Sequence, residues 1–428
     1  MKLVQKIALL AMLAPGIFIT ISCHRDRHPS DARRVMLYYV AGYNDLASYL
    51  REDIADLTAG TFIPSSKGSS NILLVFSRLA SGSSYSNNAN PPVLYRLYSE
   101  KGKVITDTLY RWPAGTLASD VNTLSDVLTR VRELFPAKSY GMVFSSHATG
   151  WVPEGYYTSA GRTSASRLSR RMYTPQPKED PDMPAVKSIG RDLNGSHSPY
   201  ELSEMEVQSF ADAIPYKLEY LMFDCCLMGG IETAYALAGK AQFVGFSQTE
   251  VLAEGFEYNT IAYHLIGRSK ADVQSVCDDY FSYYDKQSGQ YRSATISLID
   301  CDRLAPLASV CKDLFERYRA EIAALEPSDV QRFGRYHNGS NGYSDHNWYF
   351  DLKDILEKAG ITNSEKATLQ AALDECVLYE AHTPSFLNAF DINISCGLSM
   401  FLPSAGDNTI NDFYKSSFSW NDATHLIK

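Results

Sequence analysis

Two cysteines and a histidine have the types and spacing that nucleophilic catalysis requires. Cys225 and Cys226 follow the apolar run Leu218–Phe223, and His147 comes shortly after a similar run, Tyr140–Phe144. The thiolate is the reactive form of cysteine, and a histidine within hydrogen-bonding distance can take the thiol proton and later deliver it to a leaving amine. The two motifs therefore predict a thiol nucleophile paired with a histidine general acid and base.

Both apolar runs have the length and composition of buried parallel strands. In open α/β sheets, ligands bind at the carboxyl ends of such strands, where His147 and the cysteines are expected. Helix-compatible spacing from Ile231 onward predicts a helix N-terminus nearby, which lowers the pKa of a thiol. The simpler alternative is that the cysteines are small core side chains. Delivery of His and Cys at corresponding strand ends favours the catalytic interpretation.

At these motifs the sequence resembles the clostripain family of cysteine peptidases, which have a caspase-like fold. The resemblance rests on His-x-x-Gly-Trp after the first strand and Asp-x-Cys-Leu-Met-Gly after the second, which begin at His147 and Asp224. It extends over most of the chain after residue 34, including the opening strand Val35–Val40 with Asn44-Asp45-Leu46 and the segment Cys396–Ser404. The implied fold class is α/β: a three-layer α/β/α caspase-like sandwich with a mainly parallel central sheet and a smaller, more helical C-terminal region.

The resemblance also assigns roles in catalysis. The family's nucleophile is the residue two after the aspartate, which is Cys226, and its general acid and base matches His147. Successive side chains of a strand point to opposite faces, so only one thiol can face His147. Cys225, at a position commonly occupied by alanine, is then a packed thiol. An oxyanion needs aimed N–H donors, and the resemblance implies those of Cys226 and Ala148, the latter often glycine in related enzymes.

Cleavage after arginine or lysine is a further implication of the resemblance. Asp224 matches one carboxylate of the pocket for the residue before the scissile bond, and Glu254 aligns with a position that is usually aspartate. A partly desolvated carboxylate can pair bidentately with a guanidinium group. Capping of the following helix or turn by Asp224 is an equally open interpretation.

Residues 152–197 form a long segment rich in basic residues and proline, with little apolar periodicity. A stretch of this kind in a compact domain is usually functional or disordered, and a solvated surface loop is the plain alternative. In the family, the segment between the His and Cys motifs carries the site of activating self-cleavage after a basic residue. The candidate positions are Arg162, Arg167, Arg170 and Arg171.

The first 33 residues have the pattern of an export signal followed by a polar tether. The apolar stretch Ile7–Ile21 is too short, and too interrupted by Pro15, to predict a membrane-spanning helix. Ser22-Cys23 at its end is typical of a bacterial lipoprotein signal, with Cys23 as the lipidated residue. An ordinary cleaved signal peptide is the alternative. We therefore expect a cell-envelope lipoprotein, attached to membrane only through this anchor, or a secreted protein.

Composition excludes some classes of partner and cofactor. The net charge of −9 argues against nucleic acid, and the cysteines after residue 23 lack the short spacing of a zinc site or a disulfide scaffold. Calcium could bind weakly at Asp407-Asn408 or at the acidic run 179–182, although neither fits a recognised loop and solvated surface is favoured. Protein or peptide substrates are the expected partners.

Alternation of strand and helix patterns predicts a mainly parallel sheet covered on both faces. We expect three regions: residues 1–33 as signal and tether, 34–260 as the catalytic core, and 261–428 as a helical or mixed region packed on it. Strands are predicted near 35–40, 71–76, 93–98, 104–109, 243–247 and 294–299. Helices are predicted near 45–57, 203–214, 271–286, 304–325 and 364–381.

The favoured function is a cysteine endopeptidase that cleaves after Arg or Lys and is activated by self-cleavage within 152–197. The alternative is a catalytically weakened caspase-like lipoprotein that binds a peptide or partner, which Ala148 and the crowded Cys225-Cys226 pair would support. Acyl transfer or thioester hydrolysis by the same His and Cys remains open. The chain has no Gly-x-Ser-x-Gly, P-loop or dinucleotide fingerprint that would favour another enzyme class.

Overall fold

A nine-stranded sheet forms the centre of the molecule, in the strand order β12-β10-β9-β8-β5-β1-β2-β3-β4. The computed structural model describes residues 32–80, 91–153, 192–193, 202–203, 205–334 and 347–428. The five central strands pair in parallel. They are β1 (Ala32–Gly42), β2 (Asn71–Leu79), β5 (Ala137–Ser145), β8 (Leu218–Asp224) and β9 (Ala241–Phe246).

Antiparallel strands complete the sheet at both edges. One edge consists of β3 (Val93–Glu100) and β4 (Lys103–Arg111), and the other of β10 (Thr295–Asp300) and β12 (Val377–His382). The helix predicted over 364–381 is wrong in its last part, because helix α10 ends at Cys376 and β12 begins at the next residue. The Val-Leu-Tyr sequence that opens β12 favours a strand, and its pairing with β10 fixes it there.

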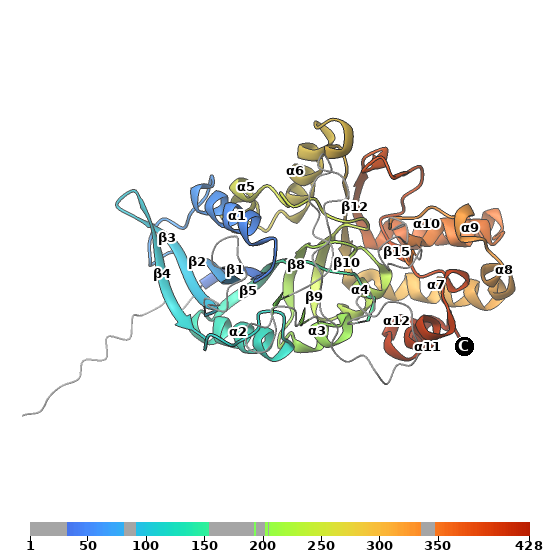
Figure 1. Ribbon diagram of the computed structural model, residues 1–428, viewed down its shortest axis with the longest axis horizontal. Coiled ribbons are helices and arrows are strands. Elements are labelled where there is room, and N and C mark those ends of the chain that lie inside the picture. The colour runs from blue at the N-terminus through green and yellow to red at the C-terminus, as the bar shows by residue number, and fades with distance from the viewer. Residues whose placement is uncertain (1–31, 81–90, 154–191, 194–201, 204, 335–346) are drawn as a thin grey trace, which may run out of the picture.

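Helices cover both faces of the sheet, as Figure 1 shows. One face carries α1 (Ala47–Ala59), α5 (Tyr258–Ala262), the π-helical turn η1 (Tyr263–Gly267) and α6 (Val273–Asp285). The other carries α2 (Val121–Leu134), α3 (Val207–Ala213) and α4 (Ile231–Ala236). The helix predicted from residue 203 begins only at Val207, because Leu202–Ser203 forms the short strand β7.

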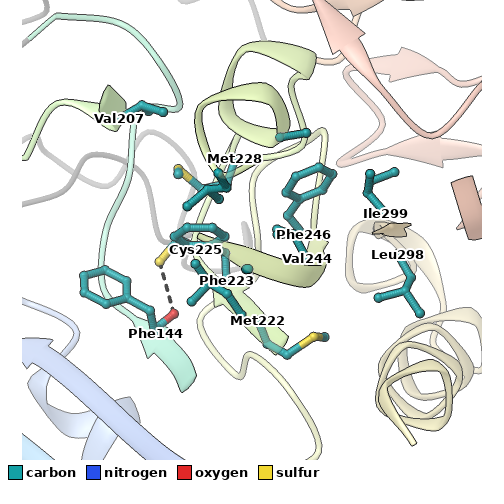
Figure 2. Packing of buried hydrophobic residues seen from close by; sticks show 14 of the residues in the cluster. Phe144, Val207, Met222, Phe223, Cys225, Met228, Val244, Phe246, Leu298 and Ile299 are labelled. Atoms are coloured by element: carbon teal, nitrogen blue, oxygen red, sulfur yellow. Dashed lines mark hydrogen bonds between the residues drawn. The ribbon is translucent and has the colours of Figure 1, made fainter. Parts of the chain in front are cut away.

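The central strands contain long apolar runs because both of their faces are buried. In β1, every residue from Val35 to Ala41 is at most 2% exposed. Buried parallel strands of this kind lose the apolar–polar alternation of a half-exposed sheet. Figure 2 shows the neighbouring packing, in which Phe223 of β8 and Val244 of β9 lie among buried side chains from several elements.

The region after residue 300 is mainly helical. Its helices are α7 (Leu304–Arg317), α8 (Arg319–Ala323), α9 (Leu352–Lys358), α10 (Asn363–Cys376), α11 (Asn408–Ser417) and α12 (Ser419–Thr424). The helix predicted over 304–325 is divided at Tyr318. Short strand pairs outside the main sheet are β6 (Asp192–Leu193) with β7, β11 (Phe350–Asp351) with β15 (Ser399–Met400), and β13 (Ser385–Phe386) with β14 (Phe390–Asp391).

Candidate active site

The register between β5 and β8 brings the predicted histidine and cysteines to one edge of the sheet. The two strands are parallel neighbours, and their last paired residues are Ser145 and Asp224. His147 and Cys226 each follow two residues later. Because each residue lies two positions beyond the same pair, His147 and Cys226 are at the same level past the ends of the two strands.

The two adjacent thiols point in different directions. The Cys225 thiol donates to the carbonyl oxygen of Phe144 at 3.4 Å, among the apolar side chains shown in Figure 2. The sulfur of Cys226 instead accepts the N–H of Val251 at 3.1 Å. The pKa of Tyr280 on α6 is raised by burial first and then by the charges of Asp224 and Cys226, so Cys226 lies within electrostatic range of α6.

A ladder of backbone hydrogen bonds holds the turn that carries Cys226. Leu227 donates its N–H to the carbonyl of Thr249 at 2.9 Å, and Gly229 donates to that of Ser247 at 2.7 Å. The Val251 contact to the thiol continues the same pairing. The turn is therefore built on the segment that follows β9, and that segment fixes the position of the thiol.

The turn after His147 packs directly against this cysteine turn. Gly150 has a φ of +63°, and a Cβ there would lie 2.5 Å from the carbonyl oxygen of Leu227. Trp151 is 2% exposed, and its ring packs edge-on against those of Phe401 and Tyr414. The packing of Gly150 and Trp151 thus determines how closely the two turns approach each other. Their role is structural rather than catalytic.

His147 has a carboxylate partner that the sequence analysis did not assign to the site. Its Nε2 lies 2.6 Å from Oδ1 of Asp45, in the turn between β1 and α1. β1 is the other parallel neighbour of β5, with Val40 opposite Ser145. Asp45 was part of the recognised Asn-Asp-Leu motif, yet the adjacency of β1 and β5 that brings it to His147 comes only from the fold.

A cavity of about 60 Å3 lies beside the histidine. His147 and Cys225 line it together with mainly apolar side chains, among them Phe144, Phe210 and Met228. One buried water needs roughly 10–15 Å3 by this measure, so the cavity has room for a small side chain. Cys226 is 0% exposed, on the other side of its turn.

Comparison with known proteins identifies the family. The sequence profile described as the clostripain family, a peptidase family, matches residues 38–165 and 178–425. The chain belongs to the clostripain family. It is therefore a cysteine peptidase by family, and the resemblance found from the two motifs is confirmed. No curated protein matches the chain in a sequence search.

Solved structures show that this clostripain-family chain has the fold of its relatives. An inactive zymogen of a C11 protease from Parabacteroides distasonis is 24% identical, with a TM-score of 0.70, over 92% of this chain and 99% of that one. A secreted C11 cysteine protease from Bacteroides thetaiotaomicron is 22% identical, with a TM-score of 0.71, over 93% and 100%. A further structure of a secreted C11 protease from that organism, with an irreversible peptide inhibitor, is 20% identical, with a TM-score of 0.70, over 93% and 100%. The predicted caspase-like α/β class is confirmed.

The two predicted carboxylates of this clostripain-family site lie in different environments. Asp224 is 0% exposed, and its Oδ2 accepts from the hydroxyls of Ser145 at 2.7 Å and Tyr258 at 2.8 Å. Gly230, not Asp224, is the N-cap residue of α4. Glu254 lies on the segment after β9 and is exposed. The pKa of Tyr49 is raised, first by burial of the Tyr49 ring and then by the negative charge of Glu254.

Two further predicted positions lie within the described residues: Ala148, a proposed oxyanion donor, and Asp407, a possible calcium ligand. Ala148 is not among the non-glycine residues with positive φ, so alanine in place of the family's glycine causes no strain of that kind. Asp407 is the N-cap of α11 and accepts from Ile410 N at 2.9 Å. Within the described ranges, no group of three or more His, Cys, Asp or Glu side chains is arranged to hold a metal ion.

Several predicted sites lie outside the described residues. These are the lipidation position, the acidic run 179–182 and the processing candidates: Cys23, Arg162, Arg167, Arg170 and Arg171. Across the part of the chain that the structure does describe, no helix is both long and apolar enough to span a membrane.

Proposed function

We propose that this chain is an exported endopeptidase that cleaves after arginine or lysine, with Cys226 as nucleophile and His147 as general acid and base. The observation that carries the assignment is the common register of β5 and β8, together with the packing of Gly150 against Leu227. The choice of Cys226 over Cys225 is supported by the family motif, in which the nucleophile is the residue two after Asp224.

The chemistry follows from these groups. The Cys226 thiolate attacks the scissile carbonyl, and the new C–S bond pushes an electron pair onto the carbonyl oxygen. The N–H groups of Cys226 and Ala148 are the proposed donors to that oxyanion. Collapse of the intermediate breaks the C–N bond, and protonated His147 supplies the proton that the leaving amine needs. Water then hydrolyses the thioester by the reverse sequence of proton transfers.

Selectivity for a basic residue is supported by Asp224. It is an acidic side chain close to the nucleophile in the sequence, and its Oδ2 accepts from the hydroxyls of Ser145 and Tyr258. Exposed Glu254 would add a second negative charge nearer the surface. A guanidinium or ammonium group is the ligand that complements such carboxylates.

Activation by cleavage within 152–197 is supported by the burial of the nucleophile. Cys226 is 0% exposed, and its thiol donates to the Val251 carbonyl at 3.7 Å as well as accepting the Val251 N–H. A substrate carbonyl cannot reach a thiol that is fully enclosed. The uncut chain is therefore a precursor, and the basic positions between the His and Cys motifs are where we place the cut.

Export with a lipid anchor is the proposed location. The signal-like segment ending at Cys23 supports the anchor, and two structural neighbours described as secreted proteases support export.

Two cysteine variants test the catalytic assignment. Protein lacking residues 1–23 is incubated with peptides that release a fluorophore after Arg or Lys, and mass spectrometry follows the intact chain. We expect a cut within 152–197 and fluorophore release, both abolished in Cys226→Ala, while Cys225→Ala keeps activity within a few-fold. The matched Cys225 variant separates loss of the nucleophile from disturbance of the turn.

The absence of cleavage would favour the alternative function, a protein that binds peptides without cutting them. An intact chain, silent peptides and a Cys226 that does not react with an alkylating peptide analogue would favour a catalytically weakened protein that binds peptides, which the enclosed thiol of the uncut chain also fits.

A further inference from the structure

The hydrogen bond between Asp45 and His147 determines which histidine nitrogen can act as a base. Nε2 of His147 is 2.6 Å from Asp45 Oδ1. An ionised carboxylate can only accept, so the proton between them belongs to Nε2. Nδ1 of His147 is buried, and no described residue hydrogen-bonds to it. The neutral imidazole therefore carries its lone pair on Nδ1.

Asp45 lies in a turn that side-chain hydrogen bonds of its neighbour close. It follows Asn44, whose Oδ1 accepts the N–H of Leu46 at 3.0 Å and whose Nδ2 donates to Ala41 O at 3.2 Å. These bonds close the turn at the carboxyl end of β1, immediately before α1. The histidine side chain is 5% exposed and the aspartate side chain 59%, so the pair is shielded on the imidazole side and open to water on the other.

We propose that Asp45 is a positioning residue for His147, which keeps Nδ1 free to take the thiol proton of Cys226. This inference rests on the proposed function and extends the His–Cys pair by a third member. The Cys226 proton moves to Nδ1, leaving a thiolate and an imidazolium whose positive charge Asp45 stabilises through the Nε2–H. When the C–N bond breaks, the same Nδ1 proton goes to the leaving amine. The thiol of Cys225 lines the same cavity as His147, and Cys226 lies on the turn that Gly150 meets at the Leu227 carbonyl.

Substitution of Asp45 by asparagine gives a specific test. The amide of Asp45→Asn can donate to Nε2, which moves the imidazole proton to Nδ1 and removes the base. We expect kcat/KM of the activated protein to fall by about 100-fold to 10,000-fold, mainly through kcat, as carboxylate-to-amide changes beside catalytic histidines do. Asp45→Ala should lose less, because water can reach this exposed position, and Asp45→Glu should recover part of the activity.

The pH dependence of Cys226 alkylation reports the ionisation of its thiol, which a purely structural role of Asp45 would leave unchanged. Removal of the carboxylate destabilises the imidazolium, so the Cys226 thiolate forms less readily. In Asp45→Asn that has been cut within 152–197, the midpoint for iodoacetamide reaction of Cys226 should move to higher pH, with Cys226→Ala providing the background.

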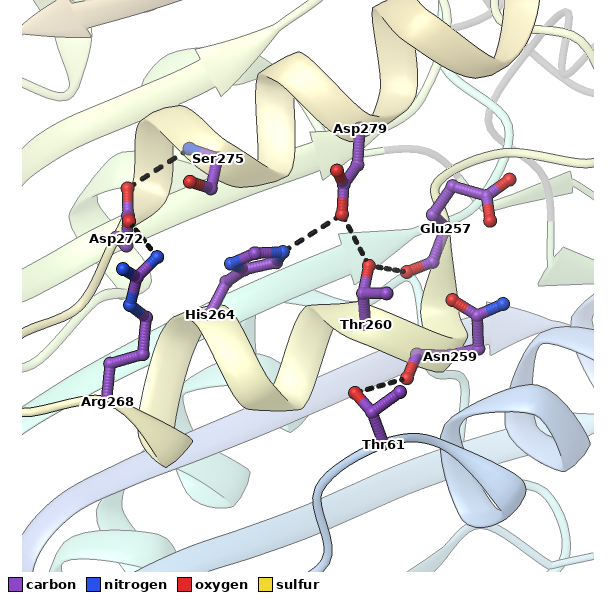
Figure 3. A network of polar contacts seen from close by, with 9 residues as sticks. All are labelled: Thr61, Glu257, Asn259, Thr260, His264, Arg268, Asp272, Ser275 and Asp279. Atoms are coloured by element: carbon purple, nitrogen blue, oxygen red, sulfur yellow. Dashed lines mark hydrogen bonds and ion pairs between the residues drawn. The ribbon is translucent and has the colours of Figure 1, made fainter.

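A second His–carboxylate pair on the same molecule supplies the matched control. His264 Nε2 lies 2.9 Å from Asp279 Oδ2, between η1 and α6, as Figure 3 shows. Asp279 is not part of the proposed machinery, so Asp279→Asn makes the equivalent change at His264 and should leave kcat/KM and the alkylation profile unchanged.

Two results separate failure of this inference from failure of the proposed function. If wild-type protein cleaves basic peptides and Asp45→Asn does so within about threefold, with the same alkylation midpoint, the positioning role is wrong. If wild-type protein cleaves nothing, the peptidase proposal fails, and an unchanged alkylation midpoint in Asp45→Asn would reject the Asp45–His147–Cys226 link as well.

Discussion

At the scale of single residues, the site depends on close approach between two turns. Gly150 needs both a left-handed backbone and the absence of a side chain, because a Cβ would meet the Leu227 carbonyl and the ring of Tyr349. The hydroxyl of Tyr349 also donates to the Thr149 carbonyl, so this aromatic ring cannot easily move away. The geometry between His147 and Cys226 therefore depends on a residue that performs no chemistry.

Gly150→Ala should reduce both stability and activity. Left-handed backbone costs a non-glycine residue roughly 1–2 kcal/mol, and the clash with a carbonyl adds roughly 1–3 kcal/mol. Gly239→Ala is the control, because Gly239 has a φ of +80° with nothing within 4 Å of the added Cβ. Urea unfolding should show a larger loss for residue 150 than for 239, and only the former should lower kcat/KM. Equal losses would mean that the Leu227 contact is unimportant.

At the scale of elements, helix α2 is set by short local signals. α2 begins after Asp120, whose Oδ1 accepts the N–H groups of Asn122 at 2.9 Å and Thr123 at 3.0 Å. Its buried side chains, Leu124, Val127 and Val131 among them, recur at helical spacing and face the sheet. This helix covers the side of the sheet opposite α1, and its cap satisfies backbone donors that no helical carbonyl can reach.

Loss of this cap should destabilise the protein without changing its chemistry. Asp120→Ala is expected to lower the free energy of unfolding by about 1 kcal/mol, whereas Asp120→Asn should retain most of it, because asparagine caps nearly as well. Denaturant unfolding of the two variants measures the difference. A similar loss in both would indicate that the charge of Asp120, not its capping bonds, stabilises α2.

At the scale of the whole molecule, a buried acid joins α4 to the segment that contains β15 and α11. Glu232 of α4 is 0% exposed, and its Oε1 accepts from Phe401 N at 2.9 Å and from the Tyr414 hydroxyl at 2.7 Å. Burial raises its pKa from 4.5 to about 7, although these hydrogen bonds act in the opposite direction. Ser399 N donates to Gly229 O at 2.9 Å, so the cysteine turn is tied to the same C-terminal segment.

The raised pKa predicts a pH-dependent contribution to stability. Below pH 4.5 both states hold the proton, whereas between 4.5 and about 7 the unfolded state releases it and the folded state keeps it. Stability from this group is therefore present at low pH and is lost as pH rises to about 7, by about 3 kcal/mol in total. Glu232→Gln does not titrate, so unfolding measured at pH 5 and pH 8 should show the variant gaining relative to wild type at the higher pH. A constant difference would contradict the raised pKa.

The sequence alone determined the central strands and the two turns that follow them. Apolar runs such as Leu218–Phe223 can only be buried, and His-x-x-Gly-Trp with Asp-x-Cys-Leu-Met-Gly is specific enough to indicate the family and the fold class. These signals are local, since burial and turn chemistry are properties of a few adjacent residues.

Only the tertiary structure decided which strands are neighbours. Asp45 and His147 are 102 residues apart, and they meet because β1 lies beside β5. The strand at Val377 follows a helix without a break, and its place in the sheet is set by its pairing with β10. Strand order and register are set by the packing of the whole core rather than by adjacent residues, so no local pattern contains them.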